Sequence, residues 1–262
     1  MEFIITLKSS TFFGLLILLL ICESAIPAIK LWRSGKQRFI HALNNILLGF
    51  INGRLAYYAF FLYLWNEMIQ LHKEHAPTLF AIENPFLATV ACIVILDIWT
   101  YWWHRLNHII PFLWRFHKVH HSDKEMDVTS ANRFHTIEIL FSGIIRCPLI
   151  FVFGFSMENI LIYEIILFVI VQFHHANIHL PEPLDKLIRL FFPSPHMHKV
   201  HHSKISNEAN SNYSSLLSIW DRVFRSFKVV NNPLKISYGI KQIENSQQSS
   251  ILKILLIPFQ KK

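Results

Sequence analysis

The sequence predicts an all-α integral membrane protein, a helical bundle of about four to five transmembrane helices. The first observation is composition: 52% of the 262 residues are hydrophobic and 16% are charged, whereas soluble domains usually carry about 25% charged residues. The second is that apolar segments of nearly 20 residues recur along the chain, and about 20 residues cross the hydrocarbon core of a bilayer. Together these observations place most of the chain inside a membrane.

The net charge of +8 excludes little by itself, because lysine and arginine that flank apolar segments suit anionic lipid headgroups. We therefore expect a membrane and no nucleic acid as partner. Cys22, Cys92 and Cys147 lie in apolar stretches and form no CxxC pair. They are interpreted as small hydrophobic residues, without a disulfide framework or a zinc finger.

Five apolar segments are predicted as membrane helices, at 11–29, 42–65, 84–103, 137–155 and 158–173. The first contains Glu23 and Pro27, and Lys8 before its leucine-rich run is also compatible with a signal peptide. We expect a retained helix, because the apolar character continues past the small residues where cleavage would fall. The fourth and fifth segments are separated only by Gly154, Ser156 and their neighbours, which predicts a tight helical hairpin.

Loop charges predict the orientation. Lys30, Arg33, Lys36 and Arg38 follow the first segment, so this loop should be cytoplasmic. The loop at 66–83 carries three glutamates and a single lysine and fits the opposite side. Because each later segment reverses direction, the chain is cytoplasmic again after the third and fifth segments. The conspicuous histidines of the sequence follow those two segments.

Thirteen of the sixteen histidines fall between positions 104 and 202. Eleven of these form the motifs WWHRLNH, FHKVHHS, FHHANIH and MHKVHHS, and HKVHHS occurs twice, beginning at positions 117 and 198. On a helix, residues three or four apart share a face. One turn of an HxxHH motif can therefore offer ligands to two neighbouring metal ions, and a helical cap at the cytosolic end of the bundle is expected to carry a histidine-rich di-metal site.

The identity of the metal is open at this point, because imidazole suits zinc, copper, iron and nickel. A structural zinc site normally includes cysteine, and soluble di-iron bundles use Glu-x-x-His pairs, which are missing here. Eight or nine histidines are enough for two ions with open positions. Two iron ions for oxygen activation are the remaining option, but the ligands alone do not exclude zinc, which is also possible in the purified protein.

The order HxxxH, HxxHH, HxxHH resembles the fatty acid hydroxylase superfamily, which includes sterol desaturases. The likeness covers 97–227, and the nearest in appearance are bacterial sterol desaturase family proteins and alkylglycerol monooxygenase. It includes these landmarks outside the motifs: Asp97 before YWWHR, Leu113-Trp114, Arg133-Phe134-His135 with Glu138, His175-Ala176-Asn177, Pro195, Asn212-Tyr213, and Trp220-Asp221 with Phe224.

The resemblance implies metal ligation by nine histidines: His104, His108, His117, His120, His121, His175, His198, His201 and His202. No catalytic residue is expected beyond these ligands. Four further residues are expected to support the ligands from outside the coordination sphere, namely Asp97, His135, Asn177 and His179. For Asp97, a structural bond to a neighbouring helix is the alternative.

The resemblance further implies a membrane-bound di-iron oxidoreductase that uses O2 to hydroxylate or desaturate a C–H bond of a sterol, fatty acyl chain or ether lipid. The lipid would come from the bilayer, a bacterial inner membrane or an ER-type membrane, and electrons from a separate donor protein. The expected division is 1–83 for N-terminal transmembrane helices, 84–230 for the catalytic domain, and 231–262 for a polar tail with a possible interfacial helix.

A histidine-rich membrane protein that binds or transports metal without redox activity is the alternative. Such a protein would need polar or ionisable residues along the spans to form a path. The histidines instead gather at the ends of the segments, and the spans hold few charges. The sequence therefore favours the enzyme.

Overall fold

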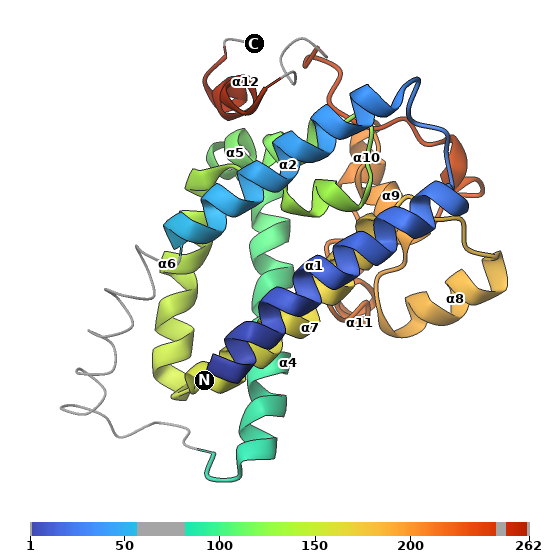
Figure 1. Cartoon of the computed structure of the whole chain (residues 1–262). Coiled ribbons are helices and arrows are strands. Elements are labelled where there is room, and N and C mark those ends of the chain that lie inside the picture. Colours follow the sequence, from blue (N-terminus) through green and yellow to red (C-terminus); the bar gives the residue numbers. More distant parts are fainter. Residues whose placement is uncertain (1, 57–81, 245–249, 261–262) are drawn as a thin grey trace.

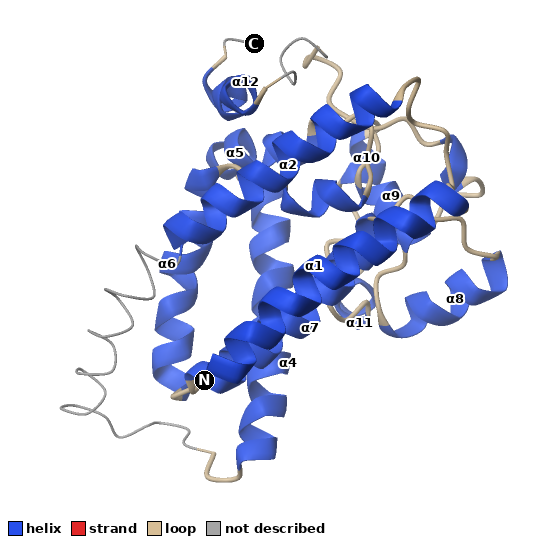
Figure 2. Ribbon diagram, in the orientation of Figure 1, coloured by secondary structure: helices blue, strands red, loops and turns tan. Residues whose placement is uncertain are grey.

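The computed structural model describes residues 2–56, 82–244 and 250–260 (Figure 1). Within these residues the regular elements are all helices (Figure 2), and pairing of extended backbone is limited to two isolated bridges, Pro27 with Ile178 and Ser203 with Tyr238. The predicted all-α class is confirmed.

Four described helices are long and apolar enough to cross a membrane. They are α1 (Glu2–Ala25, with the candidate span Thr6–Ala25), α4 (Pro85–Ile109), α6 (Thr136–Phe153) and α7 (Met157–His175). These four correspond to all but the second of the predicted segments. In the second region, α2 (Gly35–Ala56) is not among the candidate spans, and positions 57–65 of that segment lie outside the described residues.

The ends of the membrane helices follow from local sequence. Asn84 caps α4 by accepting a hydrogen bond from the Leu87 amide, and Pro85 occupies the first turn, where a missing N–H costs nothing. Gly154 ends α6 in the left-handed conformation at φ 63°. Ser156 then caps α7 with a reciprocal bond to Asn159. The predicted tight hairpin between the fourth and fifth segments is therefore present.

Two of the histidine motifs lie at the ends of α4 and α7 themselves, and the two HKVHHS motifs lie on α5 (Pro111–His121) and α9 (Pro195–His201), among the short elements beyond those ends (Figure 1). The other short elements are η2 (Val128–Asn132), α8 (Glu182–Phe191), α10 (Ser206–Ala209), α11 (Ile219–Val223) and η3 (Pro233–Lys235). Helix α5 follows α4 directly, and α9 packs on α7. The motifs, far apart in sequence, thus meet at one end of the bundle.

The tail forms a short helix, α12 (Ile251–Leu256), followed by η5 (Ile257–Phe259). One face of it is buried, with Ile254 and Ile257 in a core cluster that also contains Leu48 and Val119. Leu252 on the other face is exposed. The structure also has an amphipathic helix that the sequence analysis did not predict: α8 exposes a row of apolar side chains, Leu184, Leu187, Leu190 and Phe191.

Candidate metal centre

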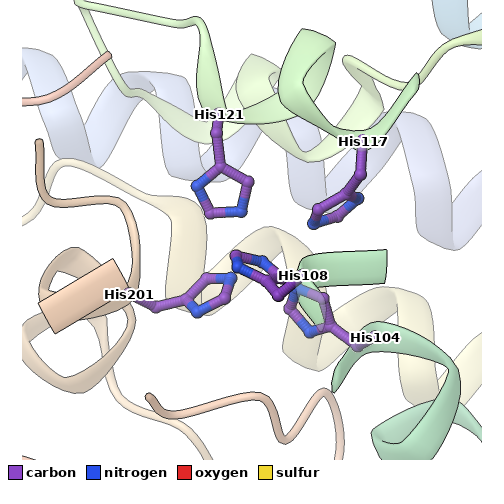
Figure 3. A group of neighbouring side chains, drawn as sticks. All are labelled: His104, His108, His117, His121 and His201. Carbon is purple, nitrogen blue, oxygen red and sulfur yellow. The ribbon is translucent and has the colours of Figure 1, made fainter. Parts of the chain in front are cut away.

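The structure brings all nine predicted ligand histidines together in two adjoining groups. The five-histidine group consists of His104, His108, His117, His121 and His201, and the four-histidine group consists of His120, His175, His198 and His202. Within each group, one nitrogen per ring lies within 4.8 Å of all the others. Figure 3 shows the five rings of the first group pointing toward one another from α4, α5 and α9. Each group has the dimensions of a single metal site.

Each HxxHH motif contributes to both groups. His117 and His121 lie four residues apart on α5 and enter the five-histidine group, whereas His120 between them enters the four-histidine group. In the second motif the sharing is reversed: His201 enters the five-histidine group, and His198 and His202 enter the four-histidine group. One helical turn therefore supplies ligands to two neighbouring sites, as the spacing predicts.

Backbone carbonyls fix the orientation of three rings. The Nδ1 atoms of His104, His175 and His201 lie 2.8, 2.7 and 2.7 Å from the carbonyl oxygens of Tyr213, Val171 and Ser211, respectively. A carbonyl oxygen only accepts, so Nδ1 must carry the proton. The lone pair of each ring is then on Nε2, which faces the group. This is the tautomer that a metal ligand needs.

The inward nitrogens of the five-histidine group have no hydrogen-bond partner among the described residues. All five Nε2 atoms are buried and unpaired. Leaving one buried acceptor unsatisfied costs about 1–3 kcal/mol, so five such atoms at one point would be strongly unfavourable by themselves. A bound cation would satisfy all five lone pairs together, and the residues present therefore fit a metal ion.

In the four-histidine group the inward nitrogens crowd one another. Nε2 of His175 lies 3.2 Å from Nε2 of His120 and 3.1 Å from Nε2 of His198, and Nε2 of His202 lies 3.1 Å from that of His198. Since the proton of His175 is on Nδ1, its Nε2 can accept only one of these contacts as a hydrogen bond. A shared cation resolves this crowding as well.

Burial keeps the rings in the form that binds metal. Desolvation, with a smaller contribution from neighbouring imidazoles, lowers the pKa of the following rings well below the usual histidine value: His120, His121, His198, His201 and His202. These rings are therefore neutral at pH 7, and a neutral imidazole is the ligand form. A set made only of imidazole nitrogens suits iron, zinc, copper or nickel.

Glu138 is a site residue that the sequence analysis noted only as a landmark. Its Oε1 lies 2.7 Å from Nδ1 of His117, and both side chains are buried. A carboxylate that accepts from a ligand imidazole fixes the ring and raises its basicity. In the same way, Oδ1 of Asn210 accepts from Nδ1 of His108 at 3.3 Å. The signal available in the sequence was an acidic residue in the first turn of an apolar segment, which is costly unless it has a partner.

Replacing Glu138 with alanine is expected to weaken metal binding about 10- to 100-fold, the usual cost of losing such a partner. Glu138→Gln should lose less, because its amide oxygen still accepts from His117. Glu158→Ala provides the control, since Glu158 is also in the first turn of a membrane helix but is exposed. Metal titration of the three purified variants measures the effect, and equal affinities for all three would show that Glu138 does not support the site.

Asp97 and Asn177 hold the scaffold and do not hydrogen bond a ligand ring in the described structure. Oδ2 of Asp97 accepts from Trp220 Nε1 at 2.6 Å and from the Leu217 amide at 3.1 Å. This is the alternative role considered for Asp97, a structural bond to a neighbouring helix. The Asn177 side chain pairs with the backbone of Ile29 at 3.1 and 2.8 Å. The bonds of Asn177 tie the end of α7 to the segment after α1. The bonds of Asp97 tie α11 and the loop before it to α4.

His135 and His179 also lie outside both groups. Nδ1 of His135 caps α6 by accepting from the Ile137 amide at 3.1 Å, and its Nε2 donates to the Leu255 carbonyl at 3.2 Å. His179 is exposed, and its backbone amide donates to Ile26. In the described structure, none of the four residues expected to support the ligands hydrogen bonds a ring of either group, whereas Glu138, Asn210 and backbone carbonyls do.

A third group of potential ligands lies apart from the nine histidines. Glu182, Asp185 and His196 approach one another closely enough to hold a cation. Arg189 already forms ion pairs with both carboxylates, at 2.7 and 2.9 Å. The guanidinium supplies the positive charge, so this group is an ion-pair network on α8 and the start of α9.

Two cavities lined by residues that the structure describes reach the histidines. One has a volume of about 320 Å³, lies among α1, α4, α6 and α7, and touches both groups through His104, His117 and His120. The other has a volume of about 390 Å³ and reaches the five-histidine group at His108 and His121 from the side of α10. The centre is therefore accessible both from between the membrane helices and from the polar segments.

Apolar helices that carry a paired imidazole site at one end define the class: a helical membrane protein with a histidine centre able to hold metal ions. The chain belongs to the fatty acid hydroxylase family, whose model matches residues 89–226. This match confirms the resemblance seen in the sequence and covers all nine histidines of the two groups.

The chain is similar to three kinds of curated protein. It is 33% identical to the ornithine lipid hydroxylase of Rhizobium tropici over 65% of this chain and 50% of that protein. It is 28% identical to the alkylglycerol monooxygenase of Xenopus tropicalis over 87% and 48%, and 22% identical to human cholesterol 25-hydroxylase over 63% and 62%. The chain thus spans about half the length of the first two. No solved structure matches it.

Proposed function

We propose that the protein is a membrane-bound di-iron oxidoreductase that uses O2 to hydroxylate a lipid C–H bond. The observation that carries this proposal is the pair of adjoining histidine groups, with five and four inward nitrogens. The relatives support the choice of a lipid, since their names describe hydroxylation of ornithine lipid and cholesterol and monooxygenation of alkylglycerol. Desaturation is the other outcome that the same centre allows.

The nine histidines would hold two iron ions, one in each group. Bound iron would supply the redox chemistry, in which reduction of O2 is coupled to oxidation of an unactivated carbon. The chain's own contribution is positional: protons on Nδ1 of His104, His175 and His201 keep the lone pairs inward. Burial of seven of the nine rings limits their contact with bulk water. No protein nucleophile or general base is required.

The two cavities suit the lipid substrate and the electron-donor protein, which would reach the centre from different sides. The cavity among the membrane helices has the apolar side chains of Ile139, Leu167 and Phe168 in its lining, and it suits a lipid chain entering from the bilayer. The cavity near α10 is lined by Lys204 and Lys241, which suit the approach of an acidic electron-donor protein. The loop charges orient this second side toward the cytoplasm.

Cells that express the protein or its His120→Ala variant under ¹⁸O2 test the proposed reaction. We expect an oxidised lipid that carries the label in cells with the wild-type protein and that is missing with the variant. A new alkene without label would indicate desaturation. Identical lipid profiles, with both proteins present in the membrane fraction in equal amounts, would contradict an oxidative function.

A further inference from the structure

Three charged residues from three membrane helices meet between the spans. Nζ of Lys8 on α1 contacts Oε2 of Glu164 on α7, and Nη2 of Arg146 on α6 lies 3.0 Å from Oε1 of the same carboxylate. Charges in this environment are costly, rare and usually functional. The metal centre does not use these residues, so they require another explanation.

The charges of this cluster do not balance. Lys8 and Arg146 carry two positive charges, and Glu164 carries one negative charge, which leaves an excess of one positive charge among apolar helices. Within the described part of the chain, Nη2 makes the only side-chain hydrogen bond of Arg146, so the rest of its guanidinium can still donate. The side chains of Arg146 and Glu164 are 21% and 16% exposed, and that of Lys8 is 41% exposed. The excess charge therefore lies partly within the bundle, where an unpaired charge is costly, and a ligand with one negative charge would neutralise the cluster.

The cluster and the histidines line the same cavity of about 320 Å³. On α6, Arg146 follows Glu138, the partner of His117, by eight residues, or about 12 Å at 1.5 Å per residue. On α7, Glu164 precedes His175 by eleven residues, or about 16 Å. The wall between these two ends includes Leu167 and Val171. The cavity therefore joins a cationic end to the metal centre along an apolar wall.

We propose that Lys8 and Arg146, which Glu164 holds in place, bind the carboxylate of a long-chain substrate, and thereby set which carbon lies beside the histidines. Only the second part of this inference, the position of the reacting carbon, rests on the proposed function, because carboxylate binding requires no turnover. An extended chain of single bonds advances about 1.2 Å per bond. A separation of about 12–16 Å therefore places the reacting carbon about ten to fourteen bonds from the carboxylate.

A carboxylate fits this cluster better than a phosphomonoester does. One negative charge balances the excess of one, whereas a phosphomonoester near neutral pH carries about −1.5 to −2. The guanidinium of Arg146 also presents a planar set of donors that matches the two oxygens of a carboxylate. The same subsite would bind a methyl ester weakly, since an ester has no charge.

Binding of radiolabelled hexadecanoic acid to the purified full-length protein in detergent tests this inference, with its methyl ester as the neutral probe. Arg146→Gln should weaken binding of the acid by about tenfold or more, in line with the loss of a charged hydrogen bond. Glu164→Gln should strengthen it, because it removes the competing carboxylate. Arg54→Gln is the control: this arginine is exposed on α2 and does not line the cavity.

The double variant Arg146→Gln with Glu164→Gln separates a loss of charge from a loss of folding. It leaves Lys8 as the one charged member of the cluster, so the excess of one positive charge is restored. We expect it to bind the acid more tightly than Arg146→Gln alone. A purely structural ion pair would give no opposite effects of the two single variants. Unchanged binding of the acid by Arg146→Gln, or equal binding of acid and ester by the wild type, would overturn the carboxylate subsite. Failure of lipid oxidation with acid-selective binding intact would instead count against the proposed function.

Discussion

Replacing His201 with alanine is expected to abolish lipid oxidation, with a loss of more than about 100-fold, and to lower the metal content from two ions per chain to about one. His201 belongs to the five-histidine group, and its ring lies 4.5 and 4.7 Å, between centroids, from those of His104 and His108. Loss of a ligand should exceed the 10- to 100-fold cost of losing a partner of a ligand. The expectation applies to each of the nine histidines, with membrane insertion unchanged.

The matched control is His179→Ala. His179 is exposed and belongs to neither histidine group, so this variant should keep both ions and full activity. Product formation and elemental analysis on the same preparations measure the two effects. A His201→Ala protein that retains wild-type turnover would show that this ring is not a ligand of a catalytic ion.

Removal of the metal is the second change expected to eliminate activity completely. Chelation should leave the two histidine groups with unpaired and crowded nitrogens, so the protein should lose stability as well as turnover. Ferrous iron should restore both properties. Zinc also suits imidazole and should restore stability, but it has no redox chemistry, so turnover should stay absent.

Thermal unfolding and product formation, measured after each addition, separate these two effects. A ligand present at about 1,000 times its Kd stabilises the folded state by about 4 kcal/mol, which is enough to move the unfolding temperature measurably. Turnover with zinc as the sole metal would contradict the oxidative proposal, and so would full activity in the chelated protein.

Much of the fold was predictable because it depends on local sequence. Apolar length defines the four candidate spans, and Gly154 with Ser156 defines the hairpin between α6 and α7. The full set of nine histidines was what the resemblance implied, and spacings of three and four residues place eight of them, all but His175, in motifs whose rings share a helical face. Their division into groups of five and four was not predictable, because it depends on how α4, α5, α7 and α9 pack together.

The supporting contacts of the site were harder to predict. The carbonyl oxygens of Tyr213 and Ser211 orient the rings of His104 and His201, and a backbone atom leaves no signal in the residue type. Asp97 was a reasonable candidate as a carboxylate in an apolar segment, yet it bonds Trp220. Glu138 has a similar sequence context and contacts His117. Which of two such carboxylates meets a ligand is decided by tertiary packing.

Anomalous X-ray scattering at the iron edge, on crystals of the iron-loaded protein, tests most directly whether these histidines hold two ions. We predict two iron peaks per chain, one among the Nε2 atoms of the five-histidine group and one among those of the four-histidine group, at about 2.0–2.2 Å from the ligating nitrogens. A single peak, or iron bound away from these nitrogens, would contradict the two-ion centre.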